Sequence, residues 1–392
     1  MPDYDPTSLD VDALLGEARA TAALDDFEDT SFREALGVLV ASLDSEAQLS
    51  TAGRFAQHAR IVDLLVNRLR VEEAFRHHPE INDEDLGAPL VIVGLARTGT
   101  TMLHRLLSSD PRHHAVAWWE NRNPAPFPGA DPDAPDPRIA VAHEQVRAIL
   151  EAAPELAAIH PWDPEGPDEE ILLMEHSFLS TTPPSFANVP TYDAWAKAQD
   201  QAPSYAYLTK MLRFLQWQKR GRDECADRWV LKTPHHLGFV EYLFEAFPGA
   251  TVVQTHRDPL ETIPSISSMY LSLHRMGSDA VDPAVVGDYC RRHYGAALAH
   301  CMAARDRLPA DRFIDVDYRS VVRDPMAAVR AIYDAAGVEL TDDAVAEMSR
   351  WAGENRRDKR AAHDYSLEQF GFDASSLAEE FALYRSRHLS EA

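Results

Sequence analysis

A short apolar run that leads into a glycine-containing loop is the feature that most constrains how this chain can fold. The run is Pro89-Leu-Val-Ile-Val-Gly94, and a helix is predicted soon after it, from Met102 to Leu107. Continuous apolar runs of this length are typical of strands that are buried on both faces of a parallel sheet. A buried strand, a loop and a helix in this order form the opening βα unit of an α/β sheet.

The loop has the spacing of a phosphate-binding loop. Gly94-Leu-Ala-Arg-Thr-Gly-Thr-Thr101 matches the Walker A pattern except that Thr100 stands in place of the lysine. A glycine before a helix lets the backbone turn tightly, so that successive N–H groups converge on an anion at the helix N-terminus. An ordinary βα turn is the alternative for this motif alone. The residues that we expect to bind a phosphate or sulfate group are Arg97, Thr98, Gly99, Thr100 and Thr101.

Three further apolar runs predict the rest of the sheet. They are Arg228–Leu231, Thr251–Thr255 and Arg312–Asp317, and helical patterns separate them. Alternation of strands and helices predicts an α/β fold, here a P-loop-like parallel sheet flanked by helices. Residues 1–87 are expected to form a helical N-terminal extension. Residues 88–392 are expected to form the α/β domain, with a helical acceptor-binding insert at about 120–225.

The helical segments carry apolar residues at three-to-four spacing. Phe32, Leu36, Val40 and Leu43 predict one helix, and Phe55, Ile61, Leu64, Leu65 and Leu69 predict a second. Within the insert, Asp168–Ser180 and Ser204–Arg220 are predicted helices, whereas the proline-rich residues 121–136 are a predicted loop.

A second anion-binding motif follows the strand Thr251–Thr255. Arg257 belongs to His256-Arg-Asp-Pro259 at the carboxyl end of that strand, where α/β sheets bind ligands. Ser265 lies eight residues later, in the first turns of the next helix. Arg257 can make a forked contact to a phosphate group. Taken alone, the motif is better explained as a local salt-bridged turn with a proline at the helix start.

The two predicted anion-binding turns, neither of which has a Walker lysine, resemble the nucleotide-binding motifs of a known family. The sequence is similar to the sulfotransferases that use 3'-phosphoadenosine 5'-phosphosulfate (PAPS), in particular to the bacterial branch with a helical N-terminal extension. The resemblance covers residues from about 88 to 373. The segments that carry it are 94–101, Arg257 with Ser265, Trp229–His236, Asp315–Pro325 and Tyr365–Gly371.

The resemblance implies how the nucleotide is bound. The glycine loop would hold the 5'-phosphosulfate of PAPS, Arg257 and Ser265 would hold its 3'-phosphate, and the product would be adenosine 3',5'-bisphosphate. The glycine-rich C-terminal loop of the animal cytosolic enzymes is not visible, and a basic cluster in a comparable place is the candidate to replace it. This basic cluster consists of Arg356, Arg357, Lys359 and Arg360. No metal is required in principle, because fixed donors and cations can hold the sulfate.

Transfer to a hydroxyl or amine also requires a base, and the sequence offers several. We prefer His235, in Lys232-Thr-Pro-His-His236, because histidine titrates near neutral pH and this one follows a strand. His236 and Glu120 remain alternatives. Lys232 and Arg97 would stabilise the leaving group, and Arg97 would act electrostatically because arginine does not readily release a proton.

The negative charge of the chain bears on its partners. Of the net charge of -25, -12 lies in residues 1–90 and -11 in residues 120–200, whereas residues 91–119 carry +2. This acidity excludes a general nucleic-acid binder and argues against docking on an anionic membrane. The insert is also rich in aromatic side chains, so we expect a neutral, lipophilic small molecule as acceptor rather than an anionic polysaccharide.

Other features of the sequence predict a cytoplasmic protein that is a possible homo-oligomer. The N-terminus lacks the pattern of a signal peptide, no apolar run is long enough to span a bilayer, and the three cysteines show no metal or disulfide spacing. Two alternative functions remain at this point. One is a P-loop-type nucleotide kinase that uses ATP, and the other is a catalytically inactive nucleotide-binding protein.

Overall fold

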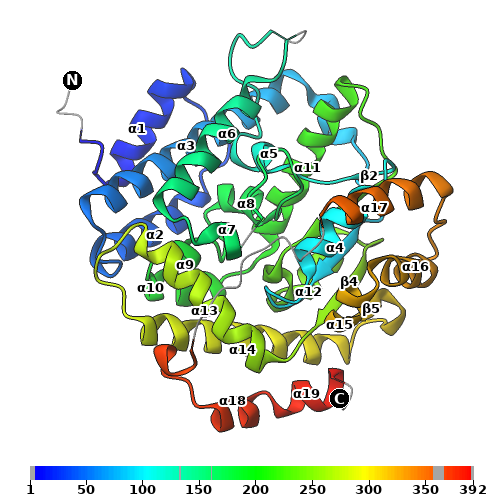
Figure 1. Cartoon of the computed structure of the whole chain (residues 1–392). Coiled ribbons are helices and arrows are strands. Elements are labelled where there is room, and N and C mark those ends of the chain that lie inside the picture. Colours follow the sequence, from blue (N-terminus) through cyan, green and yellow to red (C-terminus); the bar gives the residue numbers. More distant parts are fainter. Residues whose placement is uncertain (1–4, 132–133, 160, 356–365, 390–392) are drawn as a thin grey trace.

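A five-stranded parallel sheet lies at the centre of the computed structural model, which describes residues 5–131, 134–159, 161–355 and 366–389 (Figure 1). The strand order is β2-β3-β1-β4-β5, and every neighbouring pair is parallel. This confirms the expected fold class. The strands are β1 (Leu90–Val93), β2 (His113–His114), β3 (Arg228–Lys232), β4 (Thr251–His256) and β5 (Phe313–Asp317).

Strand β2 was not predicted, because two residues are too few to show a pattern. The other strands occur where the apolar runs placed them. Within β1, successive side chains enter different cores: Leu90 and Ile92 pack on one face of the sheet, and Val91 and Val93 on the other. All four side chains are buried, which explains why the strand reads as a continuous apolar run.

Helices cover both faces of this sheet. The first face packs against α4 (Thr100–Leu107), α16 (Pro325–Ala336) and α17 (Asp342–Glu354). The second face packs against helices of the later half of the chain and of the insert. These are α11 (Ala202–Gly221), α12 (Val240–Ala246), α13 (Pro259–Arg275), α14 (Pro283–Arg305), α18 (Ala374–Glu380) and α19 (Ala382–His388). Helix α15 (Tyr318–Arg323) follows β5.

The insert between β2 and β3 contains two long helices, α6 (Pro137–Ala152) and α11, and several short ones. The predicted helix Asp168–Ser180 is wrong, because that segment divides into α8 (Ile171–Met174) and a 3-10 turn (Glu175–Ser177) that ends at Phe178 with φ 59°. A left-handed residue of this kind stops helical hydrogen bonding. The remaining helices are α5 (Trp118–Arg122), α7 (Leu156–Ile159), α9 (Pro183–Phe186) and α10 (Pro190–Lys197).

The N-terminal extension packs on the insert. It consists of α1 (Val11–Ala22), α2 (Phe32–Ser45) and α3 (Thr51–His77), whose apolar side chains share one core with Phe178, Val189 and Tyr192. Near the C-terminus of α3, the side chains of Val71 and Phe75 pack in the core that covers the second face of the sheet. Phe55, which we expected in the core, is instead 53% exposed, because it lies in α3 ahead of Ile61, where the helix enters that core.

The start of α3 touches the end of α13 through two glycines. A Cβ atom built on Gly53 would lie 1.9 Å from the carbonyl oxygen of Gly277, and the Ser50 N–H donates to the same oxygen at 2.9 Å. The extension is therefore held against the α/β domain by a backbone contact that leaves no room for a side chain. Among the described residues, no helix is both long enough and apolar enough to cross a bilayer.

Replacement of Gly53 by alanine should separate these two helices. We expect Gly53→Ala to lower the free energy of unfolding by about 2 kcal/mol or more, since a methyl group cannot fit against a backbone oxygen. The matched control is Gly37→Ala in α2, where no atom lies within 4 Å of the added Cβ. That change should raise stability by about 0.5–1 kcal/mol. Urea unfolding measures both changes in the free energy of unfolding. If Gly53→Ala and Gly37→Ala changed it equally, the close backbone contact at Gly53 would be contradicted.

Candidate active site

The glycine loop connects β1 to α4 with three residues in the left-handed region. Gly94, Arg97 and Gly99 have φ values of 147°, 71° and 84°. A Cβ atom on Gly94 would lie 2.3 Å from the hydroxyl oxygen of Thr255, so only glycine fits there. Gly99 caps α4 without a side-chain hydrogen bond, which leaves the first N–H groups of the helix available to an anion.

The three threonines of the loop have different surroundings. The hydroxyl of Thr98 donates to the carbonyl of Leu95 at 2.6 Å and lies 2.6 Å from the hydroxyl of Thr255. It is fully buried, so only the backbone of Thr98 is left for a ligand. Within the described part of the chain, the hydroxyls of Thr100 and Thr101 have no hydrogen-bond partner, and both lie in the first turn of α4.

The structure brings the two anion-binding motifs together. Nε of Arg97 donates to the hydroxyl of Ser265 at 3.2 Å, and one terminal nitrogen of Arg257 donates to the backbone carbonyl of Arg97 at 2.8 Å. The guanidinium of Arg257 also stacks 4.3 Å from the ring centroid of Tyr318 and pairs with Glu261. The predicted cluster Arg356, Arg357 and Arg360 lies outside the described residues.

The segment after β3 places two histidines in different environments. The ring of His236 is held on both sides, by the hydroxyl of Tyr205 at 2.7 Å and by a carboxylate oxygen of Glu170 at 2.9 Å. His235 has one partner, the hydroxyl of Thr181, 2.9 Å from Nδ1. Its Nε2 is buried and has no hydrogen-bond partner among the described residues. Burial also holds the pKa of His235 well below its usual value of 6.5.

Lys232 is buried at the carboxyl end of β3. Its ammonium group forms an ion pair with Glu169, and its backbone N–H donates to Glu170 at 2.7 Å. Asp168 lies beside this pair, and burial raises its pKa although the charge of Lys232 lowers it. The end of β3 therefore carries one cation, three neighbouring acids and one histidine whose Nε2 has no hydrogen-bond partner among the described residues.

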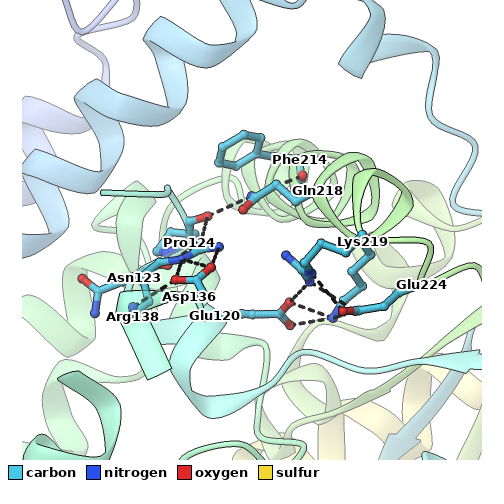
Figure 2. A network of polar contacts seen from close by, with 10 residues as sticks. Glu120, Asn123, Pro124, Asp136, Arg138, Phe214, Gln218, Lys219 and Glu224 are labelled. Atoms are coloured by element: carbon cyan, nitrogen blue, oxygen red, sulfur yellow. Dashed lines mark hydrogen bonds and ion pairs between the residues drawn. The ribbon is translucent and has the colours of Figure 1, made fainter. Parts of the chain in front are cut away.

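Glu120 does not share this environment. Figure 2 shows both of its carboxylate oxygens directed at the ammonium group of Lys219, at 2.7 and 2.9 Å. Arg222 binds one of these oxygens, and the N–H of Ala117 binds the other. Glu120 is 1% exposed and ties α5 to the end of α11. It is a structural ion pair that sequence reasoning could not recognise, because Lys219 is 99 residues away.

A cavity of about 410 Å³ opens next to His235. Its walls come from the insert, from α13 and α14, and from α3 of the N-terminal extension. The α3 residues Gly53, Ala56, Gln57 and Arg60 lie on one face of that helix. Sequence reasoning missed them because a face of small and polar residues is not distinguishable from a solvated one. The charged side chains of the wall are Arg60, Arg122, Asp168 and Glu169, and its histidines are His235 and His293.

One cluster of metal-ligating types occurs in the described ranges. It consists of His256, Asp315 and His388 at the end of β4. Arg305 donates to both carboxylate oxygens of Asp315, and the two imidazole rings stack with planes only 5° apart. Nitrogens on parallel rings do not converge on one ion. The cluster instead joins α19 to β4 beside Arg257.

Comparisons with known proteins agree with this site. The model of the sulfotransferase family matches residues 89–343, which include the loop, Lys232, His235 and Arg257. The chain belongs to the sulfotransferase family. The match begins at the apolar run before the glycine loop, so the family resemblance and the phosphate-binding geometry rest on the same residues.

Three mycobacterial proteins illustrate the similarity. Sulfotransferase STF1 from Mycobacterium tuberculosis H37Rv has a TM-score of 0.82 at 31% identity, over 95% of this chain and 98% of that one. STF9 from Mycobacterium avium has a TM-score of 0.88 at 26% identity, over 99% of both chains. The omega-hydroxy-beta-dihydromenaquinone-9 sulfotransferase Stf3 of Mycobacterium bovis is 25% identical over 72% of this chain and 71% of its own length.

The ion pair of Glu120 gives a prediction about stability. We expect Glu120→Gln to lower the free energy of unfolding by about 3 kcal/mol, because it leaves the buried ammonium group of Lys219 with only the more distant and exposed carboxylate of Glu224, 3.8 Å away. Glu165→Gln is the control, since that carboxylate is exposed and paired only with His143. It should change stability by less than about 0.5 kcal/mol. Denaturant unfolding measures both, and a stable Glu120→Gln protein that had lost turnover would instead make Glu120 catalytic.

Proposed function

We propose that this sulfotransferase moves a sulfuryl group from PAPS to a hydroxyl, or an amine, of a small and largely apolar acceptor by in-line displacement. The observation that supports this best is the contact between the two anion motifs. Arg97 reaches Ser265, and Arg257 reaches the backbone of Arg97. PAPS carries phosphate groups at both its 5' and 3' positions, so it requires two adjacent anion sites of this kind.

The loop would act on the leaving group. As the sulfur–oxygen bond breaks, negative charge grows on the oxygen that bridges sulfur to the 5'-phosphate. The N–H groups at the start of α4, the free hydroxyls of Thr100 and Thr101 and the guanidinium of Arg97 are placed to stabilise it. Lys232 is also available once it turns from Glu169 toward the sulfate. These fixed donors and cations would do this work without a metal ion.

His235 would remove the proton from the acceptor. In the tautomer in which Nδ1 carries the proton, Nδ1 donates to the hydroxyl of Thr181. The lone pair of Nε2 then has no hydrogen-bond partner among the described residues, and His235 lines the cavity. The lowered pKa keeps the imidazole neutral near pH 7, which a base requires. The hydroxyl of Thr181 would hold the ring in the tautomer that carries its proton on Nδ1.

The cavity supports a mostly apolar acceptor. Aromatic and aliphatic side chains, including Trp118, Trp162, Leu172, Phe186 and Leu273, form much of its wall. The name of the relative Stf3 describes action on a menaquinone derivative, which is a lipophilic molecule. We propose the same broad chemistry here, with an acceptor body that fills an apolar space.

Calorimetric titration with adenosine 3',5'-bisphosphate tests the choice of nucleotide. Tight binding of this compound, with weak binding of ATP–magnesium, is the expected result. Arg257→Ala should weaken bisphosphate binding about tenfold or more, because a charge-assisted contact is lost. A preference for ATP would favour a kinase. Tight bisphosphate binding without transfer to any acceptor in a broad panel would favour an inactive nucleotide-binding protein.

His235→Ala should separate catalysis from binding. We expect turnover to fall by about 10²- to 10⁴-fold, which is the usual contribution of a general base, while bisphosphate affinity stays unchanged. His236→Gln is an informative comparison, because it removes the ring that Glu170 and Tyr205 hold. That variant should lose stability. Full activity of His235→Ala would show that His235 is not the base.

The pH dependence follows from the burial of His235. Because the folded-state pKa lies well below 6.5, the imidazole stays unprotonated as the pH falls through the usual histidine range. We expect kcat/KM to be flat from about pH 8 to about pH 6 and to decrease only below that, since kcat/KM reports the free enzyme. An acidic limb with a midpoint at or above about 6.5 would contradict the assignment.

A further inference from the structure

Arg122 is a cation without a partner in the wall of the cavity. It is the last residue of α5, and its guanidinium carbon lies 5.9 Å from the ring centroid of Trp118, which also lines the cavity. Among the described residues, the guanidinium forms no hydrogen bond and no ion pair. Most other arginines near this site are held by a carboxylate or a carbonyl group, so Arg122 is unusual.

The nearby acids do not neutralise it. Glu175 is fully used by Arg60, which donates from Nε and from a terminal nitrogen to its two oxygens at 2.8 and 2.7 Å. Asp63 acts on both Arg122 and Arg70 at longer range but forms an ion pair with neither in the described structure. Arg122 therefore lies near a second cation, Arg60, and has no ion-paired carboxylate among the described residues; Asp63 acts on it only at longer range.

This arrangement costs free energy in the empty cavity. Burial, together with the charge of Arg60, lowers the pKa of Arg122. A guanidinium that is partly removed from bulk water and has no ion pair is unfavourable, and a bound carboxylate would offset that cost with two parallel hydrogen bonds. An anionic group of a ligand that binds Arg122 therefore contributes more binding free energy than the same group would at an exposed arginine.

Charged groups of both signs line the cavity together with the proposed base. Trp118, at the start of α5, adjoins residues 166–168 through the hydrogen bond from its N–H to the carbonyl of Gly166. Asp168, Glu169 and His235 also line the cavity. Arg122 lies four residues further along α5 than Trp118, which corresponds to about 6 Å of helix. A ligand in the cavity can therefore contact His235 with one group and the guanidinium of Arg122 with another.

We propose that Arg122 forms an anion-binding subsite in the acceptor cavity, and that the acceptor is a hydroxy acid with an apolar body, its hydroxyl at His235 and its carboxylate at Arg122. The placement of the hydroxyl rests on the proposed sulfuryl transfer. The carboxylate subsite does not depend on it. This differs from the neutral acceptor expected from the net charge of the insert, because Arg122 lines the cavity without an ion pair among the described residues, whereas Glu169 in the same wall is paired with Lys232.

Binding of matched acids and esters tests the subsite. The probes are ω-hydroxylaurate, a hydroxylated phenylalkanoate and a hydroxylated steroid carboxylate, each with its methyl ester, titrated calorimetrically into the full chain with and without saturating adenosine 3',5'-bisphosphate. We expect at least one acid to bind about tenfold more tightly than its ester. Arg122→Gln should abolish this preference, and Arg122→Lys should restore part of it.

The control is Arg70→Gln. Arg70 also faces Asp63 and is also desolvated, but it does not line the cavity, so the acid–ester preference should survive this change. Thermal unfolding establishes that each variant is folded. Equal binding of acids and esters, failure of every acid to bind, or a preference that persists in Arg122→Gln would overturn the subsite. Failure to bind the bisphosphate would instead overturn the proposed function. The comparison of acid and ester binding measured without nucleotide would still test the subsite.

Discussion

The carboxylate of Glu170 is the interaction on which the rest of the site depends. It is fully buried, and its two oxygens bind the N–H of Lys232 and the ring of His236, whose other nitrogen binds the hydroxyl of Tyr205. Burial alone would raise the pKa of Glu170, but these hydrogen bonds lower it. One acid from the insert thus fixes the end of β3, and with it the neighbouring positions of Lys232 and His235.

In the proposed mechanism, the two substrates are bound by different parts of the chain. The donor side is built on the sheet, where the loop after β1 and the turn after β4 meet because their strands are neighbours. The acceptor side is built by helices that come from before, within and after the α/β sequence. They meet at His235, which follows a sheet strand and is held by Thr181 of the insert. The geometry of transfer therefore depends on how firmly the insert is attached to the sheet.

The sequence was informative where the interactions are local. The apolar run and the glycine loop predicted β1 and α4, because each is encoded within a few residues. The anion-binding roles of the loop, Arg257 and Ser265 stay predictions, although Arg97 contacts both Arg257 and Ser265. The roles of Thr98 and Glu120 could not be predicted in this way, because Thr255 and Lys219 are 157 and 99 residues away. The wall formed by α3 and the unpaired state of Arg122 likewise depend on contacts between distant segments.

The position of α3 has a consequence for how such an enzyme can change over time. Its cavity face contains Gly53, Ala56, Gln57 and Arg60, whereas the glycine loop and Arg257 lie on the sheet. Of these four residues, Gln57 has a side chain that makes no hydrogen bond among the described residues, so its replacement would alter the shape of the cavity and little else. New acceptors can thus be accommodated by mutation of a helix that precedes the α/β sequence, while the machinery that handles the donor nucleotide is inherited unchanged.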